Sequence, residues 1–293
     1  AYDQQKATLA IRPTAATWKK VSATDSASTK HYMTWTSYTE YATLVQSATN
    51  SLNFTVTETV PARVSGDLKA LDGGSLGSAS DDETGGQLIW RAFWTKDSAK
   101  ASDLGTFEIV DGKDLSYNNQ SSNPNTTGAL VSEAFASANN LKVGDTLKVA
   151  AASDAKTTAK LKVRGIYKYT SESAVANPVT AARNRENAIF TNYQTFAKAG
   201  LDPQSTDKTV SGWAVPDLDV VFDAGDSATY KSLVSTLKKS KLPAKGYEFS
   251  SPSLESYNAS LEPLDTLSSR AKTGTIVLVA VGGVLLLILV LSG

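Results

Sequence analysis

Residues 218–250 read LDVVFDAGDSATYKSLVSTLKKSKLPAKGYEFS, and their apolar residues recur at the spacings of both strands and a helix. The apolar run Leu218–Phe222 predicts a strand, and Tyr247–Ser250 predicts a second one. Between them, Ser227–Leu237 places apolar side chains at three- and four-residue steps, which predicts a helix with a single apolar stripe. That stripe consists of Tyr230, Leu233, Val234 and Leu237. The stretch is therefore a βαβ unit, a strand followed by a helix and a second strand.

A second βαβ unit is predicted near the start of the chain. Ala7–Ile11 and Phe54–Thr59 have the composition of strands, and a helix between them runs to Ala48. Ser37 and Glu40 have the spacing of a capping box, which predicts where this helix begins. Its apolar face consists of Tyr38, Tyr41, Val45 and Ala48. Two distant units of this kind predict an α+β fold in which they form one split ferredoxin-like sheet.

The chain between the two units is richer in strands and predicts an inserted subdomain. Short helices are expected at Ser132 and at Tyr193. Asp72–Gly86 and Asn118–Gly128 are rich in small and polar residues, and we predict that both are mobile loops. The predicted strands are Gln87–Trp94, Thr106–Val110, Thr146–Ala151, Leu161–Tyr167 and Asn187–Thr191.

The composition excludes several classes of protein. The 293 residues include 29 basic and 29 acidic side chains, so the chain lacks the excess positive charge of a nucleic-acid-binding protein. We therefore expect no nucleic-acid partner. Cysteine is absent, which excludes disulfides and thiolate chemistry. A cysteine-free chain of this size is typical of bacterial, in particular Gram-positive, extracytoplasmic proteins.

The run Ile276–Leu291 consists only of apolar residues and glycine. A helix of this length spans ~24 Å, and about 31 Å with its uncharged flanks, which matches the hydrocarbon core of a bilayer. We predict a membrane helix over residues 273–293, cut short where the sequence stops, and a stalk helix before it over residues 253–272. Apolar side chains recur along the stalk at three- and four-residue steps, at Leu254, Tyr257, Leu261, Leu264 and Leu267.

No enzymatic site emerges from the sequence. Ser153–Lys156, Ser256–Asn258 and Lys272–Gly274 follow the order of the β-lactamase motifs, but the last two lie too close together on one stalk to converge with the first. His31 has no recognisable nucleophile beside it. No phosphate-binding glycine loop is present, so any ATP hydrolysis must come from another chain. We predict that the chain is not an enzyme and has no cofactor and no catalytic, cofactor-binding or metal-binding residues.

Two other groups of residues have a plain structural interpretation. Four aspartates surround the strand at 218–222, but they lack the spacing and the final glutamate of a calcium loop, so we interpret them as strand-end carboxylates. They are Asp217, Asp219, Asp223 and Asp226. Three tryptophans are interpreted as core packing in preference to a binding surface. They are Trp90, Trp94 and Trp213.

An ordered set of motifs resembles a known family. Residues 129–136 read ALVSEAFA and residues 140–147 read NLKVGDTL, and together they resemble a signature of the MacB-like periplasmic core domain of permeases. Three further segments of that pattern occur in order, at residues 107–113, 161–167 and 187–190. The stretch from Tyr257 to Leu267 resembles the entry to the second membrane helix of FtsX-like ABC-transporter permeases. The resemblance covers the chain from about residue 35 to its end.

The resemblance implies an extracytoplasmic domain of a permease, with residues 1 to about 270 outside the cell membrane. It divides the chain into a porter-like subdomain formed by residues 1–64 and 215–252, an inserted subdomain at 65–214, a stalk at 253–272 and a truncated membrane helix at 273–293. The partners it implies are a separate cytoplasmic ATPase subunit, a second permease in a homodimer or permease pair, the lipid bilayer, and an unknown exported substrate or extracellular partner. The implied mechanism is mechanical coupling of ATP hydrolysis to export or to regulation of that partner.

A different class of protein also fits the C-terminal pattern. A polar spacer followed by a hydrophobic tail is typical of a single-span or lipid-anchored cell-surface binding protein. Three glycosylation-type triplets, at residues 53–55, 125–127 and 258–260, are compatible with that alternative. Further membrane helices encoded after residue 293 favour the permease, and a stop codon there favours the anchor.

Overall fold

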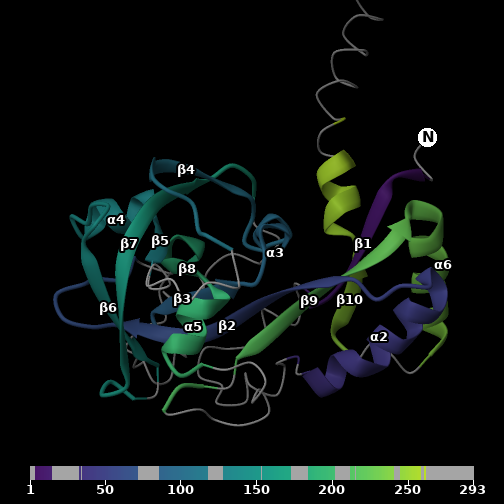
Figure 1. Cartoon of the computed structure of the whole chain (residues 1–293), viewed down its shortest axis with the longest axis horizontal. Helices are drawn as coiled ribbons and strands as arrows, with labels where there is room; N and C mark the ends of the chain where they lie inside the picture. The colour runs from purple at the N-terminus through teal and green to yellow at the C-terminus, as the bar shows by residue number, and fades with distance from the viewer. Residues whose placement is uncertain are drawn as a thin grey trace, which may run out of the picture.

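The computed structural model describes residues 4–14, 33, 35–71, 86–117, 128–152, 154–172, 184–201, 212–214, 216–240, 245–258 and 261. These residues form a mixed fold of helices and strands built on one ten-stranded sheet (Figure 1). The α+β class predicted from the sequence is confirmed.

The elements follow one another along the chain in the order of their labels within each class. The strands are β1 (Lys6–Pro13), β2 (Phe54–Val64), β3 (Leu88–Phe93), β4 (Phe107–Gly112), β5 (Gly128–Ser132), β6 (Thr146–Ala151), β7 (Thr158–Tyr169), β8 (Ala188–Asn192), β9 (Asp217–Asp226) and β10 (Tyr247–Ser250). The helices are α2 (Trp35–Thr49), α3 (Lys96–Lys100), α4 (Glu133–Ala138), the 3-10 turn η5 (Arg185–Asn187), α5 (Tyr193–Lys198) and α6 (Ser227–Lys239). A last helix begins at residue 252 and is described to residue 258.

Four strands at one end of the sheet, in the order β10-β1-β9-β2, form what we call the four-stranded part. β9 lies between β1 and β2 and is antiparallel to both, so β1 and β2 are parallel to each other. β1 likewise lies between β9 and β10 and is antiparallel to both, so β9 and β10 are parallel. Each βαβ unit therefore inserts one strand into the other, and the two units are interleaved.

The helices of both units cover one face of the four-stranded part and bury a common core. Tyr38 and Val45 of α2 pack with Leu233 and Leu237 of α6 against the alternate apolar residues of β1 and β9. The Tyr38 hydroxyl also donates a hydrogen bond of 3.1 Å to the backbone oxygen of Leu218 in β9. This buried bond fixes the helix against the strand while the ring contributes apolar area.

The predicted start of the first helix is wrong. α2 begins at Trp35, two residues before Ser37, so Ser37 lies inside the first turn and cannot serve as the N-cap. Ser37 and Glu40 are both exposed. Ala48 is also exposed, so the apolar face ends at Val45. The face formed by the two tyrosines and the valine is confirmed.

Five of the six other strands close with β2 into a six-stranded barrel, and β4 pairs with β7 outside that ring. The pairs β2–β3, β3–β8, β8–β5, β5–β7 and β7–β6 form a continuous path, and β6 returns to pair with the end of β2. β2 belongs to both parts, because residues 54–59 pair with β9 and residues 62–64 pair with β6. Figure 1 shows β2 as the long strand that joins the barrel to the four-stranded part.

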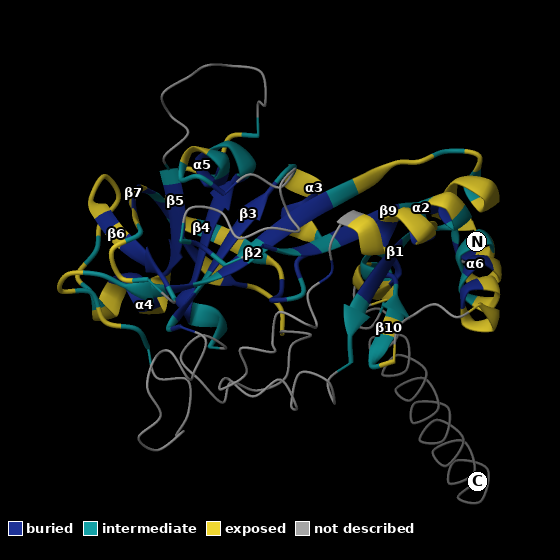
Figure 2. Cartoon of the chain, turned by 90° about the horizontal axis from the view of Figure 1, so that it is seen from below, coloured by how far each residue is buried: buried dark blue, intermediate teal, exposed yellow. Residues whose placement is uncertain are grey.

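The barrel has an apolar interior with tryptophan at its centre. Trp90 contacts the rings of Phe196 and Trp213 edge to face, each with 5.2 Å between ring centroids. The Trp90 indole N–H donates a 3.0 Å hydrogen bond to the hydroxyl of Thr191. Trp90 and Trp213 are fully buried, so their interpretation as core residues is confirmed. Figure 2 shows the barrel strands as the most continuously buried region of the molecule.

Several predictions fall on residues outside the described ranges. These are most of the two loops predicted to be mobile, His31, Ser153, and the chain beyond residue 261 with the run Ile276–Leu291. None of the helices within the described ranges is both long and apolar enough to cross a membrane.

Candidate functional site

The segment that leaves the barrel after β3 crosses the four-stranded part on the face opposite to α2 and α6. Leu9 and Ile11 of β1 face the helices, so Thr8 and Arg12, one residue out of phase, face this segment. α3 begins with a capping box formed by Thr95 and Ser98, which fixes where the segment turns. The hydroxyls of Thr95 and of Thr55 in β2 lie 2.7 Å apart and tie the turn to the sheet.

Arg12 holds this segment from the side of the four-stranded part. Its guanidinium makes two bonds to the Asp219 carboxylate, of 3.1 and 2.7 Å, and donates another to the backbone oxygen of Ala101. The side chains of Arg12 and Asp219 are 13% and 21% exposed, so water screens the pair only in part. Burial alone would lower the pKa of Arg12, but the charges of Asp219 and Asp103 raise it above its ordinary value.

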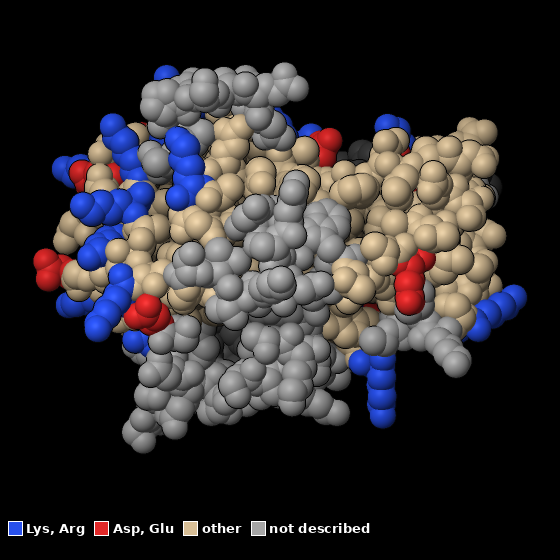
Figure 3. Space-filling view, turned by 60° about the horizontal axis from the view of Figure 1, so that its bottom comes forward, with Lys and Arg blue, Asp and Glu red and all other residues tan. Residues whose placement is uncertain are grey.

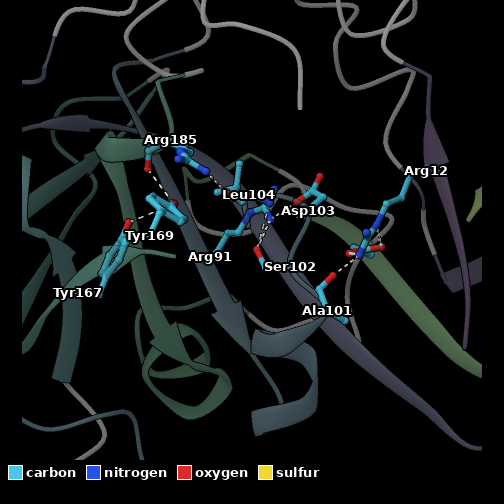
Figure 4. Close-up of polar contacts among 10 residues, drawn as sticks. Arg12, Arg91, Ala101, Ser102, Asp103, Leu104, Tyr167, Tyr169 and Arg185 are labelled. Carbon is cyan, nitrogen blue, oxygen red and sulfur yellow. Dashed lines mark hydrogen bonds and ion pairs between the residues drawn. The ribbon is translucent and has the colours of Figure 1, made fainter. Parts of the chain in front are cut away.

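Arg91 holds the same segment from the side of the barrel. Its guanidinium pairs with the carboxylate of Asp103 and donates a 3.2 Å hydrogen bond to the hydroxyl of Ser102. Burial opposes ionisation of both partners, but the mutual attraction with Arg91 keeps the pKa of Asp103 below its ordinary value. We call Arg12, Asp219, Arg91 and Asp103 the charged seam. Figure 4 shows residues 101–103 lying between the two arginines.

The contacts continue from the charged seam along the outside of the barrel. Arg185 donates hydrogen bonds to the backbone oxygens of Leu104, at 3.2 Å, and of Ser171, at 2.7 Å. Its guanidinium carbon lies 4.2 Å from the centre of the Tyr169 ring, a cation–π contact. The Tyr169 hydroxyl in turn donates to the backbone oxygen of Arg185, and its ring meets Tyr167 edge to face (Figure 4). Residues 101–104 are therefore held in turn by Arg12 of β1, by Arg91 of β3 and by Arg185, which packs on Tyr169 of β7.

Asp217 lies two residues before the seam's Asp219 on β9. Its carboxylate accepts a 2.9 Å hydrogen bond from the backbone N–H of Met33. Burial, together with the negative charge of Asp219, raises the pKa of Asp217 to about 7, although the bond from Met33 favours the ionised form. The protonation of this carboxyl therefore changes close to neutral pH.

The C-terminal helix is anchored on β1. The Thr8 backbone N–H lies 3.1 Å from the Ser251 hydroxyl and 2.9 Å from the Ser253 hydroxyl. Ser253 returns a bond from its own N–H to the Thr8 hydroxyl and another from its hydroxyl to the backbone oxygen of Lys6. Leu254, one residue on, is buried in the core beneath α2 and α6. A displacement of the helix would therefore act directly on β1.

A groove of about 600 Å³ separates α3 from the C-terminal helix. Thr8, Thr55 and Val221 form its floor on the free face of the four-stranded part. Its two walls carry Asp97 and Lys100 on one side and Pro252, Ser253 and Ser256 on the other. The groove leaves space between the two elements that contact β1 on this face.

The structure gives each aspartate around β9 a separate structural contact. Asp217 and Asp219 bind Met33 and Arg12 as described, Asp223 accepts a hydrogen bond from the Gly225 N–H, and Asp226 is the N-cap of α6. Among the residues that the structure describes, no group of three or more His, Cys, Asp or Glu side chains is arranged to hold a metal ion. Lys156 lies in the β6–β7 turn and Ser256 in the last helix, so the lactamase-like fragments do not meet within the described chain.

Sequence reasoning missed the charged seam and the helix anchor. Arg91 lies in the middle of a predicted strand, and nothing in its neighbours marks it as an ion-pair partner. Thr95 is a common N-cap residue, but Ser98 stands where the capping-box pattern has Glu or Gln, so the sequence carries only part of the signal for α3. Ser251 and Ser253 stand in a serine-rich stretch that gives no hint of a partner on β1.

No family model matches the chain. In sequence, 183 of its residues align with the uncharacterized ABC transporter permease YclI of Bacillus subtilis (strain 168) at 26% identity. The chain is similar to an ABC transporter permease. The aligned part covers 62% of this chain and 35% of YclI, so the chain spans about a third of that relative's length. YclI is named as a transporter component and not as an enzyme.

A solved structure gives a weaker match. The crystal structure of a domain of a proposed permease protein from Porphyromonas gingivalis aligns with 85% of this chain and 87% of that domain, at 9% identity and a TM-score of 0.36. This similarity is too low to support an argument about the fold or the function, so the relationship rests on YclI.

Proposed function

We propose that this chain is the extracytoplasmic domain of an ABC-transporter permease, in which a separate cytoplasmic ATPase drives movement of the membrane helices. The similarity to YclI carries the proposal, because a permease spans the membrane and depends on an ATPase for energy. In this proposal the chain is MacB-like and FtsX-like, and the run Ile276–Leu291 enters the bilayer. The domain serves export or the regulation of an extracellular partner, and it catalyses no reaction itself.

The proposed division into subdomains follows the strand pairing. The strand order β10-β1-β9-β2, with a helix after β1 and after β9, is that of a split ferredoxin-like unit, and we assign it as the porter-like subdomain. The barrel between β2 and β9 is the inserted subdomain. The helix that begins at residue 252 is the start of the stalk. β1 and this helix lie side by side, so they would reach the membrane at one place.

The proposed coupling route is a series of contacts from the stalk to the barrel. Movement of the stalk acts through Ser253 on Thr8 in β1. β1 carries Arg12, which holds Ala101, and the next two residues are held by Arg91 of the barrel strand β3. A hinge between two packed units needs two arrangements close in energy, and a few breakable polar contacts permit this better than a continuous apolar interface.

Purification tests the general proposal. The full-length membrane protein is extracted in detergent, its co-purifying proteins are identified by mass spectrometry, and ATPase activity is measured. A co-purifying ATPase subunit with turnover supports the permease. A preparation that contains neither an ATPase nor further membrane helices contradicts it and leaves a tethered surface protein.

Distance measurements test the coupling route. These 293 residues contain no cysteine, so Lys198→Cys in α5 and Lys238→Cys in α6 give two spin-label sites within them, one on each part. We expect ATP to change the distance distribution in the complete complex. A charge in the stalk, Leu261→Lys, should abolish that change while ATP hydrolysis continues, and Leu261→Met is the matched control. An ATP-dependent change that persists in the charged variant rules out transmission through the stalk.

A further inference from the structure

Basic side chains gather on the β6–β7 hairpin, at the end of the molecule remote from the C-terminal helix. Figure 3 shows Lys and Arg concentrated at the end of the molecule that carries these two strands, which Figure 1 places at the left, with the last helix to the right of the middle. The whole chain has equal numbers of basic and acidic residues, but residues 142–164 contain only two acidic ones, Asp145 and Asp154. The basic residues of this stretch are Lys142, Lys148, Lys156, Lys160, Lys162 and Arg164.

The register of the hairpin brings three of these lysines together. Lys148 in β6 is directly opposite Lys160 in β7, and Lys162 follows two residues later on the same face. The residues between them, Leu147 and Leu161, point into the barrel and are buried. The apolar interior therefore fixes the direction of the lysines, which are all exposed. We call Lys148, Lys160 and Lys162 the lysine face.

This arrangement is unfavourable for the folded chain by itself. Like charges directly opposite each other on antiparallel strands are destabilising. None of the three lysines forms an ion pair with another residue in the described ranges. The two nearby carboxylates are engaged by backbone, since Asp145 accepts from the N–H of Lys142 and Asp154 from that of Lys156. Within the described ranges the repulsion between the lysines is therefore not offset by an ion pair, and a bound anion would offset it.

We propose that the lysine face binds a linear polyanion, and specifically a phosphate polymer outside the cell. Lys160 and Lys162 lie about 7 Å apart along β7, and Lys148 is directly opposite Lys160, which gives three neighbouring cations for a chain of repeating negative charges. Lysine carries a compact charge with three donors, which suits phosphate oxygens. The flanking outward side chains, Thr146 and Thr158, are small and polar. The face therefore lacks the aromatic and apolar centre typical of a protein interface.

The position of the lysine face argues against a bilayer surface as the ligand. Figure 1 places the β6–β7 hairpin at the left end of the molecule and the helix that precedes the apolar run to the right of the middle, so the lysine face lies at a distance from the point where this run would enter a membrane. The argument against a bilayer rests on the proposed function, but binding of a soluble polymer does not require that function. A failure of ATPase association would therefore leave the binding result intact.

Binding of labelled polyphosphate to the full chain in detergent tests the proposal. Fluorescence anisotropy is measured over a range of salt concentrations for the chain and for the triple variant Lys148→Gln, Lys160→Gln, Lys162→Gln. The triple variant should lose about tenfold or more in affinity, with a salt dependence lower by about two to three counterions. The matched control removes three exposed lysines of α6, with Lys231→Gln, Lys238→Gln and Lys239→Gln, and should change the affinity less than about twofold.

Two outcomes would overturn the proposal. Equal losses in the two triple variants would mean that net charge alone governs the interaction. Tighter binding of polyglutamate than of polyphosphate at equal charge would replace the phosphate polymer with an acidic protein segment.

Measurement of thermal stability independently tests whether the opposed lysines destabilise the hairpin. Lys160 faces Lys148, whereas Lys168 on the same strand faces Glu108. Lys160→Thr should therefore raise the Tm by about 1–3 °C, and Lys168→Thr should leave it unchanged or lower it. A lower Tm for Lys160→Thr would show that the opposed lysines cause no strain, and the argument for a ligand would be lost.

Discussion

Trp90 and Arg91 are neighbours on β3 and are both buried, but they belong to regions of opposite chemistry. Trp90 points into the barrel, where it meets the rings of Phe196 and Trp213 and the hydroxyl of Thr191. Arg91 points to the other face of the strand, where it meets Asp103 and Ser102 in the charged seam. One strand thus separates an apolar interior from a buried set of charges, because successive side chains alternate between faces.

The two regions stabilise the molecule by interactions that differ in strength and in how specific their geometry is. Burial of apolar surface is strongly favourable and has no directional preference, so the barrel interior supplies stability. A buried ion pair gains little net free energy over an apolar pair, but breaking one partner is costly and the geometry of the pair is specific. We infer that the apolar interior stabilises the barrel. The charged seam then determines the position of the barrel relative to the four-stranded part.

The largest loss of stability is expected for a substitution in the barrel interior. Trp90→Ala removes a fully buried ring with two aromatic contacts and should lower the free energy of unfolding by about 3–5 kcal/mol. Chemical denaturation followed by circular dichroism measures the change, with the exposed Lys198→Ala as control. A loss below about 1 kcal/mol would mean that the barrel repacks easily, and the contrast between the two regions would disappear.

The next largest loss of stability is expected when one partner of the ion pair between Arg91 and Asp103 is removed. Arg91→Met leaves Asp103 buried without its cation and should cost about 3 kcal/mol. Adding Asp103→Leu should restore much of that loss, because both charges are then gone. A double-mutant cycle in denaturant gives the coupling energy. If the two losses simply add, the pair is not coupled and the seam is no different from any polar surface.

Asp217 differs from the barrel interior because its contribution to stability depends on pH. Its folded-state pKa of about 7 lies above that of an unfolded aspartate, ~3.9, so the folded chain binds the proton more tightly between these values. Its contribution to stability is therefore complete below about pH 4 and is lost as the pH rises through 7. Asp217→Asn keeps an oxygen for the Met33 N–H and should flatten the stability profile over this interval, with a gain on the order of 2 kcal/mol at pH 8.

Denaturation of both proteins between pH 4 and pH 8 measures this difference. Trp90→Ala serves as the comparison, because a change in the apolar interior should shift the whole profile without altering its slope. Parallel profiles for the chain and Asp217→Asn would show that Asp217 titrates normally.

The smallest effect is expected at the helix anchor. Ser253→Ala removes the hydroxyl that lies 2.9 Å from the Thr8 N–H and should lower global stability by only about 1 kcal/mol, because Ser251 can still accept from that group. Amide hydrogen exchange at Thr8 should nevertheless become faster, since the local contact is weakened. Ser256→Ala, at an exposed position on the same helix, is the control. Unchanged exchange at Thr8 would mean that the anchor rests on Leu254 alone.

The two βαβ units and most strands were predictable because their apolar residues follow the local periods of helix and strand. Closure of the barrel was not predictable, because it depends on pairing between Ala62 and Ala151, which no local pattern specifies. The ion pair of Arg12 with Asp219 was likewise not predictable, because it joins two distant parts of the chain. The error at Ser37 has a different origin, since a capping-box pattern within a helix looks the same as one at its start.

The interleaving of β1 with β9 has a consequence for the order in which the chain folds. Leu9 pairs with Phe222, so β1 has no partner in β9 until the chain has been synthesised through β9. The barrel, whose strands come from one continuous stretch, can assemble earlier. During that interval the apolar side of β1 has no partner from β9 and is exposed to wrong pairing, the usual hazard of long-range strand contacts. Expression yield should therefore depend on how quickly residues 217–250 emerge after the barrel.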